Sequence, residues 1–220
     1  QEPTAQIVYA EDELSLQIFD TSGTRRSANI GDNIRSGETL RTGSGAAELR
    51  LNPNGTIIKL ARNTSFKVEA LDGLNGRSSN DFQLISGKLR AVAARSTGRE
   101  NYRIRTRGAV AGVRGTDFSL EVVEGRSDIL YVQSGKVEFS RMSEGIETGR
   151  IMVGAGQFAD ALAADFQVLP ASADIINRFQ DLEFVNLNPA SVDQSAPIIE
   201  DDPIESAAEE LPSTDSEDEE

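Results

Sequence analysis

The sequence predicts an all-β protein. We expect an antiparallel two-sheet sandwich, or a β-roll or solenoid-like body, followed by one C-terminal amphipathic helix and a disordered acidic tail. Two observations predict the body. Apolar and polar residues alternate with a period of two in several short segments, which is typical of strands with one buried face. Turn signals rich in Gly, Asn and Asp separate these segments at short intervals, which favours β-hairpins over βαβ units.

The alternation is clearest in four segments: AAELRLN (46–52), SFKVEAL (65–71), DFSLEVV (117–123) and GKVEFS (135–140). In DFSLEVV, the apolar positions are Phe118, Leu120 and Val122. We expect the residues between them to face solvent, as we expect of Glu48 and Arg50 in AAELRLN.

The tripeptide Ser-Gly-Lys occurs twice, at 86–88 and 134–136. An apolar residue precedes each copy closely and β-like alternation follows it. We interpret both copies as tight hairpins whose glycines, Gly87 and Gly135, adopt a positive φ.

One segment has the periodicity of a helix. In SADIINRFQDLEF (172–184), Ile175, Phe179 and Leu182 recur at i, i+4 and i+7, and Ser172 suits the N-cap. The domain organisation that we predict is a β-domain over 1–168, a helix packed on it over 169–187, and an acidic tail or linker over 188–220.

The excess negative charge lies at the C-terminal end. The net charge is −14, yet residues 181–220 hold 14 acidic and no basic residues, so that residues 1–180 are formally neutral. Residues 188–220 contain no aromatic side chain and are rich in Pro, Ser, Asp and Glu, a composition typical of disorder. We interpret the tail as a solvated terminus, or as a docking segment for a basic partner.

The composition narrows the possible chemistry. The chain has no His and no Cys, which excludes disulfides, thiolate catalysis and His-based proton transfer or metal binding. Its glycine motifs run into strands, whereas a dinucleotide fingerprint opens a helix. No apolar run approaches the roughly 18 residues of a membrane helix. We therefore predict no enzyme activity, no catalytic or metal-binding residues, no cofactor and no transmembrane segment.

A basic run precedes the centre of the chain. Between Lys88 and Arg114 there are eight basic residues and one acidic residue. If NYRIRTR is a strand, Arg103, Arg105 and Arg107 form a ladder on one face. Neighbouring acidic strands would offset these charges, and we name Glu69, Glu121 and Glu138 as candidates. Alternatively, the ladder binds an anion or a partner, or docks the acidic tail; nucleic acid is not expected, because stacking aromatics are scarce.

The segment AVAGVRGTDF (109–118) is interpreted as a structural turn. Its residues Gly112, Arg114, Gly115 and Asp117 suit close backbone packing before a strand. We expect Arg114 to tie the turn to a carboxylate or to carbonyl groups, with Asp117 as the candidate partner.

Three stretches together resemble the FecR domain family: 30–68, 82–93 and 104–140, with GRIMVGAGQFADA (149–161) matching the closing strand. The segment AGVRGTDF is the most specific part of this resemblance. The resemblance covers about residues 7–163 and implies an all-β, non-catalytic, extracytoplasmic bacterial domain. In founding members of the family, the domain follows a membrane helix and relays a signal to a cytoplasmic anti-sigma segment.

We therefore expect a periplasmic or cell-envelope module, with its signal peptide removed, that binds or scaffolds another envelope protein or an anionic envelope polymer. A second hypothesis is a signalling module that acts on a regulator such as an anti-sigma factor. A third is a protein that binds polysaccharide or peptidoglycan. The family has no agreed catalytic or cofactor residues, and none are assigned here.

Overall fold

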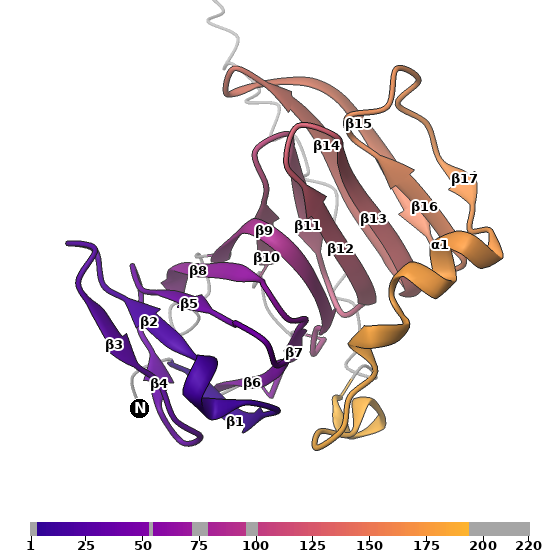
Figure 1. The fold of residues 1–220 in the computed structure, drawn as a ribbon. Coiled ribbons are helices and arrows are strands. Elements are labelled where there is room, and N and C mark those ends of the chain that lie inside the picture. Colours follow the sequence, from indigo (N-terminus) through magenta and orange to yellow (C-terminus); the bar gives the residue numbers. More distant parts are fainter. Residues whose placement is uncertain (1–3, 53–54, 72–78, 96–100, 194–220) are drawn as a thin grey trace, which may run out of the picture.

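The computed structural model describes residues 4–52, 55–71, 79–95 and 101–193 (Figure 1). These residues form a 17-stranded, open mixed sheet with one α-helix. The all-β prediction is confirmed at this level. Within the described residues, no helix has the length and apolar character needed to cross a membrane.

The strands pair in two series that share β9 (Ser79–Val92). The first series contains, in order of pairing, β4 (Asn33–Ile34), β1 (Thr4–Ala10), β6 (Ala47–Asn52), β7 (Ile57–Leu60), β9, β12 (Asp117–Val123), β13 (Ser127–Ser134), β16 (Gln157–Asp160) and β17 (Leu169–Pro170). The second contains β3 (Arg25–Ser27), β2 (Gln17–Phe19), β5 (Thr39–Arg41), β8 (Ser65–Leu71), β9, β10 (Asn101–Arg105), β11 (Ala109–Val113), β14 (Lys136–Ser143) and β15 (Ile146–Gly154).

The sheet is mixed because β10 pairs in parallel with β9, with Arg103 opposite Asp81. The prediction of a purely antiparallel body is therefore wrong at this pair. The physical reason is that β10 starts at Asn101, opposite Ser79 at the start of β9, so that both strands run in one direction.

The chain changes series within β9. Residues 80–86 pair with β8 in the second series, whereas residues 87–92 pair with β12 in the first. Gly87 lies at this change with φ +92. The positive φ predicted for Gly87 and for Gly135 (φ +84) is confirmed, but the predicted hairpins are wrong, because at both positions the chain continues into the other strand series instead of folding back.

The two series share one core. The largest buried side chains include Phe66, Phe82, Phe118 and Phe139, which belong to the same hydrophobic cluster although they come from both series. Phe66 and Phe82 stack with their ring centroids 5.4 Å apart.

A C-terminal strap, residues 172–193, packs on strands of the first series, where β13, β16 and α1 lie side by side in Figure 1. It contains α1 (Ala173–Arg178) and the 3-10 helices η2 (Gln180–Leu182) and η3 (Pro189–Ser191). Ser172 caps α1 as predicted, accepting a hydrogen bond from the backbone of Ile175. The predicted helix over 169–187 is too long, because the chain tightens into η2 after Phe179. The buried anchors Phe179 and Leu182 thus follow α1, which has no buried residue of its own.

Some residues that we predicted to face solvent are buried, because the strap covers that face of the strands. Ser119 and Glu121 of β12 are buried beside it, and so is Glu48 of β6. Glu48 accepts hydrogen bonds from the backbone N–H groups of Asn186 (3.0 Å) and Leu187 (2.8 Å). The alternation in the sequence predicted the strands correctly, but their outer face is covered.

The start of the predicted tail is packed as well. Residues 189–191 form η3, and Val192 is buried against Ile57, Val92 and Ala94. The predicted boundary of the tail at residue 188 is therefore too early in the sequence. The remainder of that tail, residues 194–220, lies outside the described residues.

Candidate functional site

The segment Arg114–Thr116 forms a corner that carries the chain from β11 in the second strand series to β12 in the first. Gly115 adopts φ +59 at this corner, in the left-handed region that glycine tolerates best. Thr116 is buried, whereas Arg114 is exposed. The predicted turn therefore exists, and it directs an arginine outward.

Asp117, the residue expected to bind Arg114, binds Arg90 instead. Two hydrogen bonds of 2.9 Å join the guanidinium of Arg90 to the two carboxylate oxygens. These bonds raise the pKa of Arg90 above its usual value. Arg90 also lies 3.1 Å from a carboxylate oxygen of Glu183. Arg90 therefore connects Asp117 of the segment AVAGVRGTDF to Glu183 of the strap. It can do so because β9 places Arg90 beside β12.

The predicted arginine ladder is only partly on a strand. Arg103 and Arg105 lie on β10, whereas Arg107 follows the end of the strand. Arg103 donates two hydrogen bonds to Asp81, at 2.7 and 2.8 Å, which raise the pKa of the guanidinium. Arg105 donates to Glu69, with 2.9 Å between Nε and Oε2.

The expectation that acidic neighbours offset the ladder is confirmed for Glu69. It is wrong for Glu121, which pairs with Arg178 of the strap, and for Glu138, which lies 3.5 Å from Arg150. The physical reason is position: β12 lies in the first strand series, and β11 separates β14 from β10.

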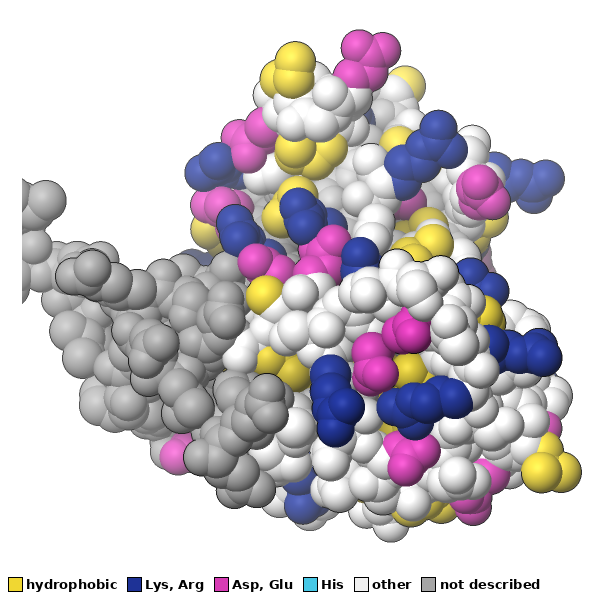
Figure 2. All heavy atoms as spheres, turned by 90° about the vertical axis from the view of Figure 1, so that its left-hand side faces the viewer, with side chains coloured by type: hydrophobic (Ala, Val, Ile, Leu, Met, Phe, Trp, Pro, Cys, Tyr) yellow, Lys and Arg dark blue, Asp and Glu magenta, His cyan; other side chains and the backbone are white. Residues whose placement is uncertain are grey.

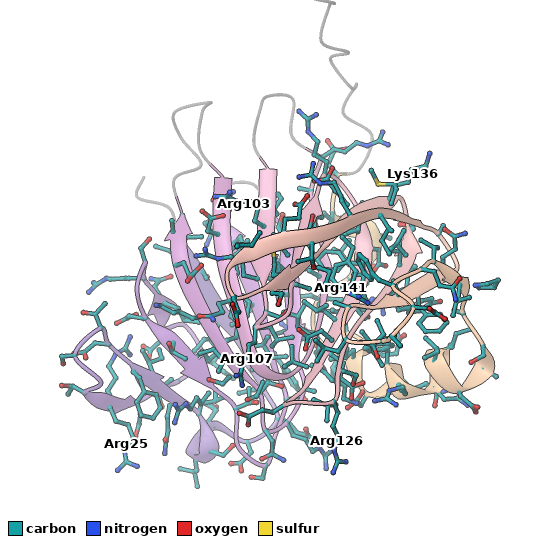
Figure 3. All side chains as sticks on the ribbon, turned by 90° about the horizontal axis from the view of Figure 1, so that it is seen from above. Arg25, Arg103, Arg107, Arg126, Lys136 and Arg141 are labelled. Carbon is teal, nitrogen blue, oxygen red and sulfur yellow. The ribbon has the colours of Figure 1, made fainter. Side chains whose placement is uncertain are left out.

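The ladder residues reach different cavities. Arg103 lines a cavity of about 680 Å³, and Arg107 lines another of about 860 Å³. Figure 3 shows Arg103 and Lys136 toward one side of the molecule and Arg107 and Arg126 toward the other. The ladder is therefore not a single contact surface.

The smaller cavity is rich in positive charge, and we call it the basic cavity. Among the described lining residues, the cations are Arg95, Arg103, Arg114 and Lys136, and the carboxylate is Glu138. The remaining lining residues are Gly112, Val113, Gly115, Gly135 and Met152. The predicted ladder and the predicted turn meet here, since Arg103, Gly112, Arg114 and Gly115 all line this one cavity.

Gly115 has a specific role in the wall of the basic cavity. A Cβ at this position would overlap Cγ of Arg95. The stem of Arg95 therefore lies over the glycine, and any larger residue would displace it. Arg95 and Lys136 make no ion pair with another described residue.

The larger cavity has mixed charge. Arg107 and Arg126 line it together with Glu124, Asp128 and Glu144. Asp128 is buried and accepts a hydrogen bond of 3.0 Å from the backbone of Gly108. Because positive and negative groups are balanced here, this cavity is a weaker candidate for an ionic ligand.

Positive and negative side chains are also mixed on other parts of the described surface. On the face in Figure 2, Lys and Arg side chains lie among Asp and Glu side chains. Among the described residues, no three Asp or Glu side chains are grouped so as to hold a metal ion. The sequence did not single out Arg95 or Lys136. Only the count of basic residues, and the Ser-Gly-Lys repeat that contains Lys136, pointed toward them.

The fold and the site define a mostly β protein with a cavity rich in cations beside the corner at Arg114–Thr116. The comparison with known families is specific: residues 38–138 match the family described as "FecR protein". This match confirms the resemblance over residues 38–138. The segment holds all lining residues of the basic cavity except Met152.

Two solved structures have a similar fold. Each is described as a "putative anti-sigma factor" from Parabacteroides distasonis ATCC 8503. One has a TM-score of 0.51 and the other 0.50, and both are 15% identical to this chain. They cover 64% and 63% of this chain, which in turn spans 63% and 62% of theirs. No curated protein sequence matches this chain.

Proposed function

We propose that this chain is a non-catalytic, extracytoplasmic signalling module that binds an acidic segment of another protein in the basic cavity. One observation carries the proposal: the corner within AVAGVRGTDF forms the wall of a cavity whose described lining has four cations and one carboxylate. The FecR domain over 38–138 supports a role in signalling or regulation. The similar fold of the two Parabacteroides distasonis structures supports the same role.

The electrostatics favour a carboxylate-rich ligand. Hydrogen bonds between a guanidinium or ammonium group and a carboxylate are roughly twice as strong as neutral ones. Arg95 and Lys136 have no ion-pair partner among the described residues, so a ligand would not have to displace one. A cavity lined by one sign of charge also steers an oppositely charged partner during encounter.

The body is suited to rigid recognition. We propose that the two strand series act as the layers of a sandwich, braced by the strap through Glu48, Arg90 and Lys88. Partners that bind a preformed surface usually change the backbone little. The periplasm or cell envelope is the location that the FecR resemblance implies, and it is part of this proposal.

Two kinds of ligand are compatible with the cations of the basic cavity. In the first hypothesis, a protein partner docks there, and docking changes the fate of a regulator such as an anti-sigma factor. In the second, an anionic envelope polysaccharide or peptidoglycan binds there. We favour the protein, because the described cations gather around one cavity, whereas a polymer chain needs a longer track of cations.

The test compares capture by the full chain with capture by two charge-matched variants. One variant carries Arg95→Glu and Lys136→Glu in the cavity. The control carries Arg25→Glu and Lys67→Glu, which lie on β3 and β8, outside the cavity. Each is immobilised and exposed to bacterial envelope extract, and bound proteins are identified by mass spectrometry.

We expect one protein from the extract to bind to the immobilised wild type and to the control variant. The same protein should not bind to the cavity variant. Equal retention by both variants would overturn the role of the cavity. Retention of an anionic polymer in place of a protein would favour the second hypothesis.

A further inference from the structure

The last described residue of the chain lies beside the basic cavity. The backbone N–H of Arg95 donates a hydrogen bond of 2.8 Å to the carbonyl oxygen of Asp193. The side chain of the same Arg95 lines the cavity. Residues 194–220 therefore begin at the rim of this site.

The point of departure is fixed by packing. Val192 is buried with Ile57, Val92 and Ala94 in a small hydrophobic cluster. Leu187 belongs to the same cluster, and its backbone N–H is held by Glu48. The C-terminal end of the strap is therefore held at a defined place on the body.

The charges of the two parts are complementary. Residues 194–220 contain eleven acidic and no basic residues. The described lining of the basic cavity has four cations, of which Arg103 pairs with Asp81, and one carboxylate, Glu138, which lies 3.5 Å from a guanidinium nitrogen of Arg150. Two of the four cations, Arg95 and Lys136, make no ion pair with a described residue.

We propose that the acidic segment 194–220 of this chain docks in the basic cavity and competes there with the acidic partner. The docking itself stands on the geometry and charge above. The competition rests on the proposed function. The tail is then a tethered competitor that lowers the apparent affinity of the module until a partner with stronger contacts displaces it.

The tail is long enough to reach the site. Glu200, its first acidic residue, follows Asp193 by seven positions, a span of up to roughly 23 Å when extended. A short flexible tether gives an effective concentration in the millimolar range. Weak individual ion pairs therefore suffice to populate the docked state.

The docking is tested by paramagnetic NMR on the full chain. The chain contains no cysteine, so Ser213→Cys provides a single site for a nitroxide label. The amide signals to be followed are those of Gly112, Gly115, Gly135 and Lys136, and those of Arg25 and Arg26 serve as a distant reference.

The matched control has the same label and the same tail length without the charge. All eleven acidic residues of the tail are replaced: Glu200→Gln, Asp201→Asn, Asp202→Asn, Glu205→Gln, Glu209→Gln, Glu210→Gln, Asp215→Asn, Glu217→Gln, Asp218→Asn, Glu219→Gln and Glu220→Gln. A label on either tail broadens some signals near residue 193 simply because the tail starts there, so the informative quantity is the difference between the two.

If the tail docks, the amide signals of the cavity broaden more in the protein with the charged tail than in the protein with the neutral tail. Docking also predicts that Arg95→Glu with Lys136→Glu, or a high salt concentration, removes the difference. Equal broadening by both tails would overturn the docking. Because this measurement involves no partner, its failure leaves the proposed function standing.

The competition has its own readout. If the docked state holds nine tenths of the molecules, the neutral tail raises the apparent affinity for the captured partner by about tenfold. An unchanged affinity would overturn the competition even where the NMR shows docking.

Discussion

The methyl group Cγ2 of Thr116 occupies the space that a side chain at Gly135 would need, since a Cβ there would lie 2.7 Å from it. The same relationship recurs between Thr64 and Gly87, where a Cβ would lie 2.7 Å from Cα of the threonine. Each threonine ends a corner between the strand series, and each glycine belongs to a Ser-Gly-Lys motif. The internal similarity of the sequence is therefore a similarity of structure.

Replacing Gly135 with alanine is expected to lower the free energy of unfolding by about 3 kcal/mol. The left-handed backbone costs an alanine about 1 kcal/mol, and the overlap with Thr116 adds about 2 kcal/mol of overpacking. Urea denaturation measures the change. Gly125→Ala is the control, because Gly125 has φ +68 but no atom within 4 Å of its added Cβ. A loss as large at Gly125 would contradict the role of the threonine contact.

Glu48→Gln is expected to loosen the strap. Glu48 and Lys59 are 0% and 3% exposed, with 3.0 Å between Oε1 and Nζ. Removing one charge of a buried pair costs about 3 kcal/mol, because the other charge remains buried. Hydrogen exchange at Asn186 and Leu187 should accelerate, whereas exchange at Gly112 should not.

The control for this change is Glu147→Gln, which removes an exposed pair with Arg150. Its free energy of unfolding should change by less than about 1 kcal/mol. Unchanged exchange in the strap of the Glu48 variant would show that the carboxylate does not anchor it.

Arg90 on β9 and Arg95, which follows this strand, should have different roles. Arg90→Met is expected to lower the free energy of unfolding by about 2 kcal/mol, because Arg90 and Asp117 are only 11% and 14% exposed and share two charged hydrogen bonds. Arg95→Met should change it by less than about 0.5 kcal/mol yet weaken partner capture. The reverse ranking in thermal denaturation would assign the structural role to Arg95.

Acid should weaken one turn of the chain selectively. Hydrogen bonds from Ser22 and from the backbone of Thr24 lower the pKa of Asp20 below its usual 3.8. A carboxylate whose pKa is lower in the folded than in the unfolded state stabilises the fold at pH values above its unfolded-state pKa. This stabilisation disappears as the pH falls through the folded-state pKa. The difference in Tm between wild type and Asp20→Asn should therefore be constant above about pH 5 and shrink below pH 4. A difference that grows in acid would contradict this sign.

Local patterns in the sequence predicted local structure well. The segments 65–71 and 117–123 coincide with β8 and β12, because alternation reports which residues of one strand face the core. The positive φ of Gly87 and Gly135 followed from the same kind of local reasoning.

The errors concern contacts between distant segments. Asp117 faces Arg90 and not Arg114 because β9 runs beside β12, and no pattern around Asp117 encodes that neighbour. Glu48 is buried because the strap returns to it from residues 186 and 187. The basic cavity likewise combines residues from β10, β14 and two corners, so that the sequence named Arg103 and Arg114 but missed Arg95 and Lys136.

The proposed function requires that an acidic protein segment contacts the basic cavity. Zero-length carbodiimide cross-linking tests it directly, because it joins lysine amines only to carboxylates in contact with them. The full chain is mixed with the captured partner, and links from Lys136 in the cavity are compared with links from Lys67 on β8. We predict partner carboxylates joined to Lys136 and not to Lys67, with loss of these links in 1 M salt, where the Debye length falls to about 3 Å. Links to Lys67 without links to Lys136 would contradict the account.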